Sequence, residues 1–87
     1  MSEKSLLTFP CTFAIKAMGK SSPELDLIVV EIVRRHSPNL GEGAVSSRPS
    51  KGGNYTAITV MIEAHSRQQL DAIYLDLNRS PHILMTL

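Results

Sequence analysis

The segment from residue 16 to residue 22 carries residue types that suit recognition of a small carboxylate. Gly19 would let the backbone approach a ligand closely, and two serines then precede a stretch of helical periodicity. Free amide groups at the start of a helix attract anions, and the helix dipole strengthens that attraction. The predicted ligand-binding residues are Lys16, Gly19, Lys20, Ser21 and Ser22. The alternative is that Gly19 makes a turn and the serines only cap the helix.

Catalytic and metal chemistry find little support among the other residues. Cys11 has no charged neighbour in the sequence, so a structural role is expected rather than a nucleophilic one. His36, His65 and His82 lack ligand spacing, and Glu63 with His65 would supply two of the four ligands that a closed zinc site needs. Phosphate-loop and dinucleotide-binding motifs are missing. We therefore expect no enzyme activity, no metal and no cofactor.

A basic residue and two glycines precede Tyr55, an order similar to the third strand of an RNA-recognition motif. Base stacking needs further aromatic side chains on the same face, and the next positions there hold Ala57, Thr59 and Met61. Nine Lys and Arg against eight Asp and Glu leave a net charge of +1, which is a poor basis for binding polyanions. We expect no nucleic acid partner.

Length and cysteine content indicate one small intracellular domain. The 87 residues suffice for a single core, and the one cysteine cannot form an internal disulfide, which fits the reducing cytoplasm. The longest aliphatic run covers residues 27–30, so no segment is predicted to span a membrane. We expect a leader over residues 1–10, a single domain over residues 11–87, a cytoplasmic location and no membrane partner.

The first half of the chain predicts a strand and a helix. Residues 12–18 alternate with period two, and Gly19 is expected to end that strand. A helix is predicted to begin near residues 22–23, because Ser21 and Glu24 have the spacing of a capping box and Pro23 follows Ser22. Its apolar stripe runs from Leu25 at helical spacing to residue 33, and it is expected to end before residue 38.

The second half predicts a hairpin, a helix and a last strand. Residues 44–50 form a weak polar strand that Pro49 places at a sheet edge, residues 51–54 form a turn, and residues 55–63 form the clearest strand. Ser66 and Gln69 have capping-box spacing and begin a second helix. Residues 82–87 form a short final strand.

The order βαββαβ predicts an α+β, ferredoxin-like sandwich. Its antiparallel sheet would have the order 4-1-3-2, with both helices on one face. The strand residues expected to face the helices are Phe13, Ile15, Ile58, Val60 and Ile62. The open face should carry Lys16, Met18, Tyr55, Thr59, Met61 and Glu63, of which Met18, Tyr55 and Met61 are predicted contacts. Methionines on the open face would contact an acyl chain, a partner subunit or the leader. Contact with the leader is intramolecular, so no entropy of association is lost.

Several motifs resemble the YbeD family of small bacterial proteins of uncharacterised activity. The similarity covers nearly the whole chain from about residue 5, with two departures, at Cys11 and at the second glycine of residues 51–54. The motifs are Phe9-Pro10, Lys16-Ala17-Met18-Gly19, Ser22-Pro23-Glu24-Leu25, Val33-Arg34-Arg35-His36-Ser37-Pro38, Ser50-Lys51-Gly52 with Gly53-Asn54-Tyr55, and Leu84-Met85-Thr86-Leu87.

The resemblance implies a fold close to that of ACT regulatory domains and a role in binding lipoic acid. ACT domains bind small molecules near the first strand-to-helix loop, which here is Gly19–Ser22. We therefore expect a non-enzymatic regulatory domain that binds lipoate or another small carboxylate. The alternative is an adaptor that binds a partner enzyme through the open sheet face or an edge strand, without a small ligand. The apolar ending, Ile83–Leu87, would let two copies pair as a homodimer.

Overall fold

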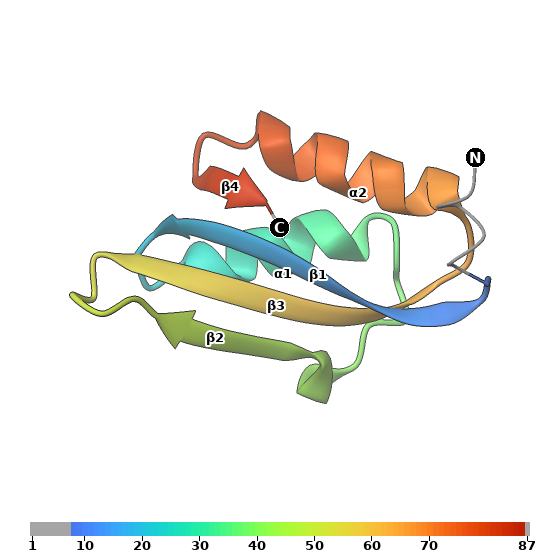
Figure 1. Ribbon diagram of the computed structural model, residues 1–87, viewed down its shortest axis with the longest axis horizontal. Helices are drawn as coiled ribbons and strands as arrows, with labels where there is room; N and C mark the ends of the chain where they lie inside the picture. The colour runs from blue at the N-terminus through green and yellow to red at the C-terminus, as the bar shows by residue number, and fades with distance from the viewer. Residues whose placement is uncertain (1–7, 87) are drawn as a thin grey trace.

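The computed structural model describes residues 8–86, which form one four-stranded sheet and two helices (Figure 1). The elements are β1 (Cys11–Lys20), α1 (Leu25–Arg34), the short 3-10 helix η2 (Glu42–Ala44), β2 (Val45–Pro49), β3 (Tyr55–Ala64), α2 (Arg67–Arg79) and β4 (Ile83–Thr86). The covering of the open face was expected from Leu6, Leu7 and Phe9 of the leader. Residues 1–7, and with them Leu6 and Leu7, lie outside the described residues, whereas Phe9 is half-buried and packs against the core.

The sheet has the order β2-β3-β1-β4, and all its pairings are antiparallel. In the view of Figure 1, α1 passes behind β1, and α2 runs along the upper side of the sheet near β4. The buried side chains of β1 and β3 pack against those of both helices on one face, so the opposite face is left open. The longest ladder joins β1 to β3 and runs from Cys11 opposite Ala64 to Lys20 opposite Tyr55. These observations confirm the predicted α+β fold and strand order.

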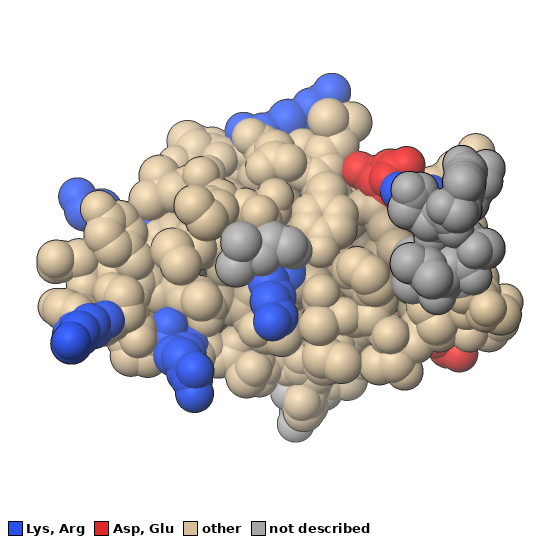
Figure 2. Space-filling model, viewed as in Figure 1, with Lys and Arg blue, Asp and Glu red and all other residues tan. Residues whose placement is uncertain are grey.

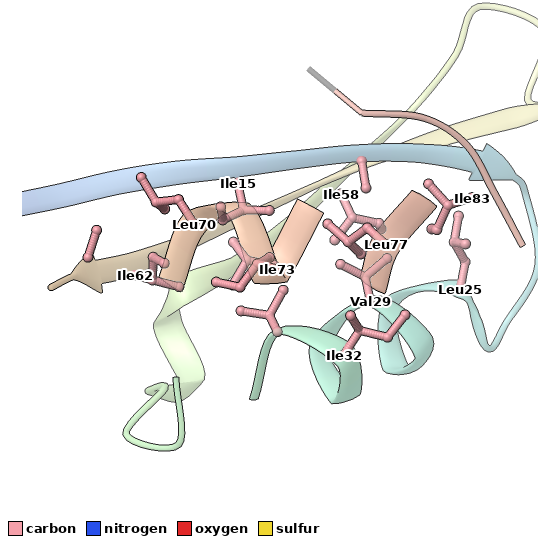
Figure 3. Close-up of a cluster of buried hydrophobic side chains, with 14 residues drawn as sticks. Ile15, Leu25, Val29, Ile32, Ile58, Ile62, Leu70, Ile73, Leu77 and Ile83 are labelled. Atoms are coloured by element: carbon pink, nitrogen blue, oxygen red, sulfur yellow. The ribbon is translucent and has the colours of Figure 1, made fainter. Parts of the chain in front are cut away.

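The core lies between the helices and the sheet, where side chains from both layers converge (Figure 3). Alternation along β1 and β3 sends every second residue into this layer, because successive strand residues point to opposite faces. Ile15, Ile58, Val60 and Ile62 are buried as predicted, and Phe13 is half-buried against the core. The largest of the fully buried side chains are Ile15, Leu25, Ile58, Ile73, Leu77, Val29, Val33 and Val60.

The junction between β1 and α1 differs from the sequence prediction. The strand does not stop at Gly19 but continues to Lys20, and Gly19 pairs with both Thr56 and Ile83. The helix begins only at Leu25, and its N-cap residue, Glu24, makes no side-chain capping hydrogen bond. The predicted capping box was therefore wrong, because the hydroxyl of Ser21 is bonded to that of Thr56 instead of to the start of the helix.

The start of α2 confirms the predicted cap. The hydroxyl of Ser66 accepts a hydrogen bond from the Gln69 N–H at 3.1 Å, and Gln69 Oε1 accepts one from the N–H of His65 at 2.6 Å. The same glutamine donates from Nε2 to the carbonyl oxygen of His36 at 2.9 Å. One side chain thus closes the helix start and ties it to the end of α1.

Neither α1 nor α2 has the length and apolar character needed to cross a lipid bilayer, and these are the α-helices found within residues 8–86.

We expect Leu77→Ala to lower the free energy of unfolding by about 2–5 kcal/mol, because it opens a cavity in the core. Leu77 is fully buried on α2, whereas Leu75 on the same helix is 54% exposed. Leu75→Ala is therefore the matched control and should change stability by no more than about 0.5 kcal/mol. Urea denaturation of both variants measures the difference, and equal losses would contradict this assignment of the core.

Candidate functional site

A cleft of about 410 Å³ lies at the corner where β1 ends and β4 begins. Three segments that are distant in sequence form it: the β1–α1 loop, the start of β3, and the α2–β4 loop with the first residues of β4. The β1–β3 register brings two of these segments together, because it places Lys20 directly opposite Tyr55. The lining residues are Lys20, Ser21, Ser22, Leu25, Tyr55, Pro81, His82 and Leu84.

The cleft combines apolar walls with a polar rim. Leu25 is buried at its base, and Leu84 is 61% exposed on its opposite wall. Lys20, Ser22 and His82 are exposed side chains on the rim. Such a mixture can hold a short apolar chain that ends in a charged or hydrogen-bonding group.

Ser21 has a structural task at this corner. Its N–H donates to the carbonyl oxygen of Asn54 at 2.9 Å, and its hydroxyl lies 2.7 Å from the hydroxyl of Thr56. Both bonds join the β1–α1 loop to the hairpin formed by β2 and β3. The backbone N–H of Ser21 is therefore already hydrogen-bonded within the protein and is not available to an anion.

The start of α1 already carries negative charge from the chain itself. Glu24 caps the helix and Asp26 lies in its first turn, where Asp26 Oδ1 accepts a hydrogen bond from the N–H of Leu27 at 2.8 Å. Acidic groups at a helix N-terminus complement the dipole and repel a further anion. A carboxylate at this corner would therefore be held by Lys20 and His82 rather than by helix amides, which changes the mechanism expected from the sequence.

Gly19 is buried and lies beneath the cleft. A Cβ atom at this position would overlap the carbonyl oxygen of His82 and would lie 2.9 Å from Leu25 Cδ1. The missing side chain thus lets the α2–β4 loop and α1 approach the end of β1. This is a packing requirement of the fold, and Gly19 is not among the residues that line the cleft, so its ligand contact stays a prediction.

The other predicted site residues lie on the open face of the sheet, and of these Tyr55 also lines the cleft. Lys16 is exposed opposite Thr59, and Met18 is half-buried between its partners on β3 and β4. Met61 is 42% exposed near the other end of β3, and Tyr55, at 44%, belongs to both the face and the cleft. The structure therefore divides the predicted residues between two surfaces.

Sequence reasoning missed Pro81, His82 and Leu84 as cleft residues. The loop between α2 and β4 reaches the corner only because β4 pairs with the end of β1. A histidine after a proline carries no local signal for such a position. Tertiary structure alone could reveal it.

A second polar cluster joins the two helices. His36 Nε2 lies 2.6 Å from Asp76 Oδ2, and both side chains are about one quarter exposed. The hydrogen bond from His36 holds the pKa of the Asp76 carboxyl below its ordinary value, and the nearby charges of His36, Arg35 and Arg79 act in the same direction. His36 therefore joins the end of α1 to α2.

Burial raises the pKa of the Tyr74 hydroxyl, and a hydrogen bond with the Lys16 backbone opposes that rise. Tyr74 thus links α2 to the backbone of β1. Among the side chains described for residues 8–41 and 43–86, no group of three or more His, Cys, Asp or Glu is placed to hold a metal ion.

Comparison with known proteins identifies the family. Residues 4–87 match the family model described as "Protein of unknown function (DUF493)". The chain belongs to the DUF493 family. A UPF0250 protein of Paraburkholderia phytofirmans is 46% identical over 84 residues, which cover 97% of this chain and 94% of the relative. A UPF0250 protein of Chromobacterium violaceum is 45% identical over 85 residues, which cover 98% and 96%. The YbeD resemblance is confirmed, because YbeD proteins belong to this same family.

The DUF493 fold also occurs in a solved structure. The solution structure of protein HP0495 from H. pylori superposes with a TM-score of 0.73 at 13% sequence identity. The match covers 99% of this chain and 90% of the other. At this level of identity the likeness shows the shared fold.

We expect Gly19→Ala to lower the free energy of unfolding by about 1–3 kcal/mol or more, because the added methyl group must displace backbone of the α2–β4 loop. Gly41→Ala is the matched control, since a Cβ there meets no atom within 4 Å. Thermal unfolding of the two variants tests this. A Gly19 variant as stable as the control would show that the corner is loosely packed.

Loss of the His36–Asp76 bond should be visible as a change in the pH dependence of stability. The folded-state pKa of Asp76 lies below the ordinary value near 3.8, so this carboxylate stabilises the fold above pH 3.8. That contribution is lost as the pH falls through the folded-state pKa. Asp76→Asn should remove it.

Urea denaturation across pH 2 to 7 measures this effect, with pH values chosen around the ordinary carboxyl pKa of about 3.9. The variants Asp76→Asn, His36→Gln and their combination form a double-mutant cycle. Its coupling energy should be favourable at neutral pH and should fade in acid. Strict additivity at neutral pH would show that the 2.6 Å contact does not contribute to stability.

Proposed function

We propose that this DUF493 protein is a non-enzymatic binding domain that takes a small carboxylate with an apolar chain, such as lipoate or octanoate, in the corner cleft. The observation that carries this proposal is the combination of apolar walls at Leu25 and Leu84 with the exposed groups Lys20 and His82 on one rim. An acyl chain would lie against the leucines and Tyr55. Its carboxylate would meet the ammonium group of Lys20.

The size of the cleft supports a small ligand of modest affinity. Its volume of about 410 Å³ lies near the lower end of the range usual for ligand sites. Burial of about four methylene groups would contribute roughly 3 kcal/mol, and an exposed ion pair adds no more than about 1 kcal/mol. The sum corresponds to a dissociation constant of about 1 mM. Apolar contact would thus provide most of the affinity and Lys20 the preference for an acid.

A regulatory role would follow from the position of the cleft beside the sheet edge. Leu84 belongs both to the cleft wall and to β4, the edge strand next to β1. A ligand against Leu84 would hold β4 and the loop before it in place. Pairing of β4 with a second copy or with a partner enzyme would then be linked to ligand occupancy, because each event favours the same ordered edge.

Calorimetry with lipoate, octanoate and a panel of amino acids tests the proposal. We expect octanoate and lipoate to bind, and Lys20→Glu to weaken octanoate binding by about fivefold or more, through loss of an ion pair and gain of repulsion. Lys51→Glu is the matched control, because Lys51 is exposed and lies outside the cleft. Octanamide should bind the unaltered protein more weakly than octanoate.

Absence of heat with every carboxylate, while the protein remains folded, would end the proposal. Equal octanoate affinity of the Lys20 and Lys51 variants would show that the carboxylate does not bind beside Lys20. Gly19→Val is unsuitable for this test, because a side chain there collides with the His82 carbonyl and disturbs the fold itself. Light scattering with and without octanoate measures whether self-association depends on the ligand.

A further inference from the structure

The strands of this nearly neutral chain carry an excess of positive charge. The strands carry Lys16, Lys20 and Arg48 against one acid, Glu63. Figure 2, which views the open face of the sheet, shows Lys and Arg spread over it, whereas the visible acidic residues lie toward the right of the view. The helical layer carries both signs in nearly equal number: its acids are Glu24, Asp26, Glu31, Asp71 and Asp76, and its arginines are Arg34, Arg35, Arg67 and Arg79. The sheet face is therefore cationic, although the whole chain has a net charge of only +1.

One row of side chains crosses all four strands on that face. Met18 lies opposite Met85 on β4 and opposite Ala57 on β3, and Ala57 lies opposite Arg48 on β2. Lys16 stands one row away, roughly 7 Å from Met18 along β1. We call Lys16, Met18, Arg48, Ala57 and Met85 the sheet-face patch. Its small central residue, Ala57, leaves a shallow floor between the methionines and the arginine.

Among the side chains that the structure describes, the cations of the patch have no acidic partner. The ion pairs described there are His36–Asp76, His65–Glu63 and Arg67–Asp71. Glu63, the one acid on the strands, is 3.9 Å from His65 at the far end of β3. The positive charge of Lys16 and Arg48 is thus available to an external partner.

The patch also exposes apolar surface next to those charges. Met85 is 50% exposed, and Met18 is half-buried beside it. Methionine side chains are flexible and polarizable, so they adapt to apolar groups of different shapes. A complementary partner must therefore present apolar side chains flanked by carboxylates.

We propose that the sheet-face patch binds a short acidic segment of another protein, with its apolar side chains against Met18 and Met85 and its carboxylates near Lys16 and Arg48. Charge complementarity selects this occupant. The patch shares no residue with the corner cleft, so the inference is independent of the small carboxylate proposed there.

The dimensions of the face favour a segment over a folded domain. Three strand spacings of about 4.8 Å and ten residues of β3 give a flat area of roughly 470 Å². A standard interface buries about 800 Å² on each partner, so this face suits a smaller and transient contact. A helix of about twelve residues is roughly 18 Å long and fits within it.

Two other occupants are less compatible with the same observations. A symmetric pair of copies stacked through this face would bring Lys16 and Arg48 of one copy toward the same cations of the other. Single-stranded nucleic acid would find Tyr55 as the one aromatic side chain on the strands' open face within residues 8–86, too few for base stacking. An acidic protein segment meets neither difficulty.

Chemical-shift mapping of the isotope-labelled full chain tests the proposal. The probe is a synthetic helical peptide of about twelve residues, with a leucine stripe flanked by glutamates. We expect shifts at Lys16, Met18, Arg48 and Met85. The paired substitution Lys16→Glu with Arg48→Glu should weaken binding about tenfold or more, and so should raising the salt from about 0.05 M to 0.3 M.

The matched control is Arg34→Glu with Arg67→Glu, which makes the same charge change at exposed positions of the helical layer. It should leave peptide affinity and the position of the shifts unchanged. Thermal unfolding of both double variants is measured as well, to check that they remain folded.

The proposal is overturned if the acidic peptide does not bind, or if its glutamine counterpart binds equally well. Peptide shifts confined to other surfaces would have the same consequence. Preferential binding of oligo-dT would assign the patch to nucleic acid, and light scattering that shows a dimer disrupted by Lys16→Glu would assign it to a second copy. None of these results bears on octanoate binding, which depends on Lys20 in the separate cleft.

Discussion

The antiparallel ladder between β1 and β3 is the interaction on which the other features of this protein depend. Ten consecutive residues of each strand are paired, and the register places Ile15 opposite Val60. A slip of one residue would turn these side chains toward solvent and bring Lys16 and Met18 into the core. Burial of the apolar set on one face therefore specifies the register, and the register in turn arranges both faces of the sheet.

The same ladder creates two separate surfaces. At its end it sets Lys20 beside Tyr55, where the α2–β4 loop completes the cleft around them. Two residues before that end it sets Met18 beside Ala57 and so builds the patch on the open face. Gly19, between these two positions, faces the helical layer and permits close packing there. A ligand and a protein partner can thus be recognised by neighbouring residues of one strand without competing for the same side chains.

The family comparison is consistent with a fold defined by pattern. HP0495 keeps this fold at 13% identity, which fits a sheet specified by alternation and burial rather than by individual side chains. The DUF493 relatives share far more of the sequence, at 46% and 45% identity. The family description leaves function open. The proposals for the cleft and the patch therefore depend on local chemistry.

Residue order alone predicted the strand and helix sequence, the sheet order, the faces of β1 and β3 and the Ser66 cap, because alternation, helical spacing and capping are local properties of the chain. It did not predict that β1 continues through Gly19, that α1 begins at Leu25, or that His82 and Leu84 complete the cleft. These features arise from contacts between segments far apart in sequence, such as the pairing of Gly19 with Ile83. Only the packed tertiary structure determines them, because such contacts form once distant strands and loops meet.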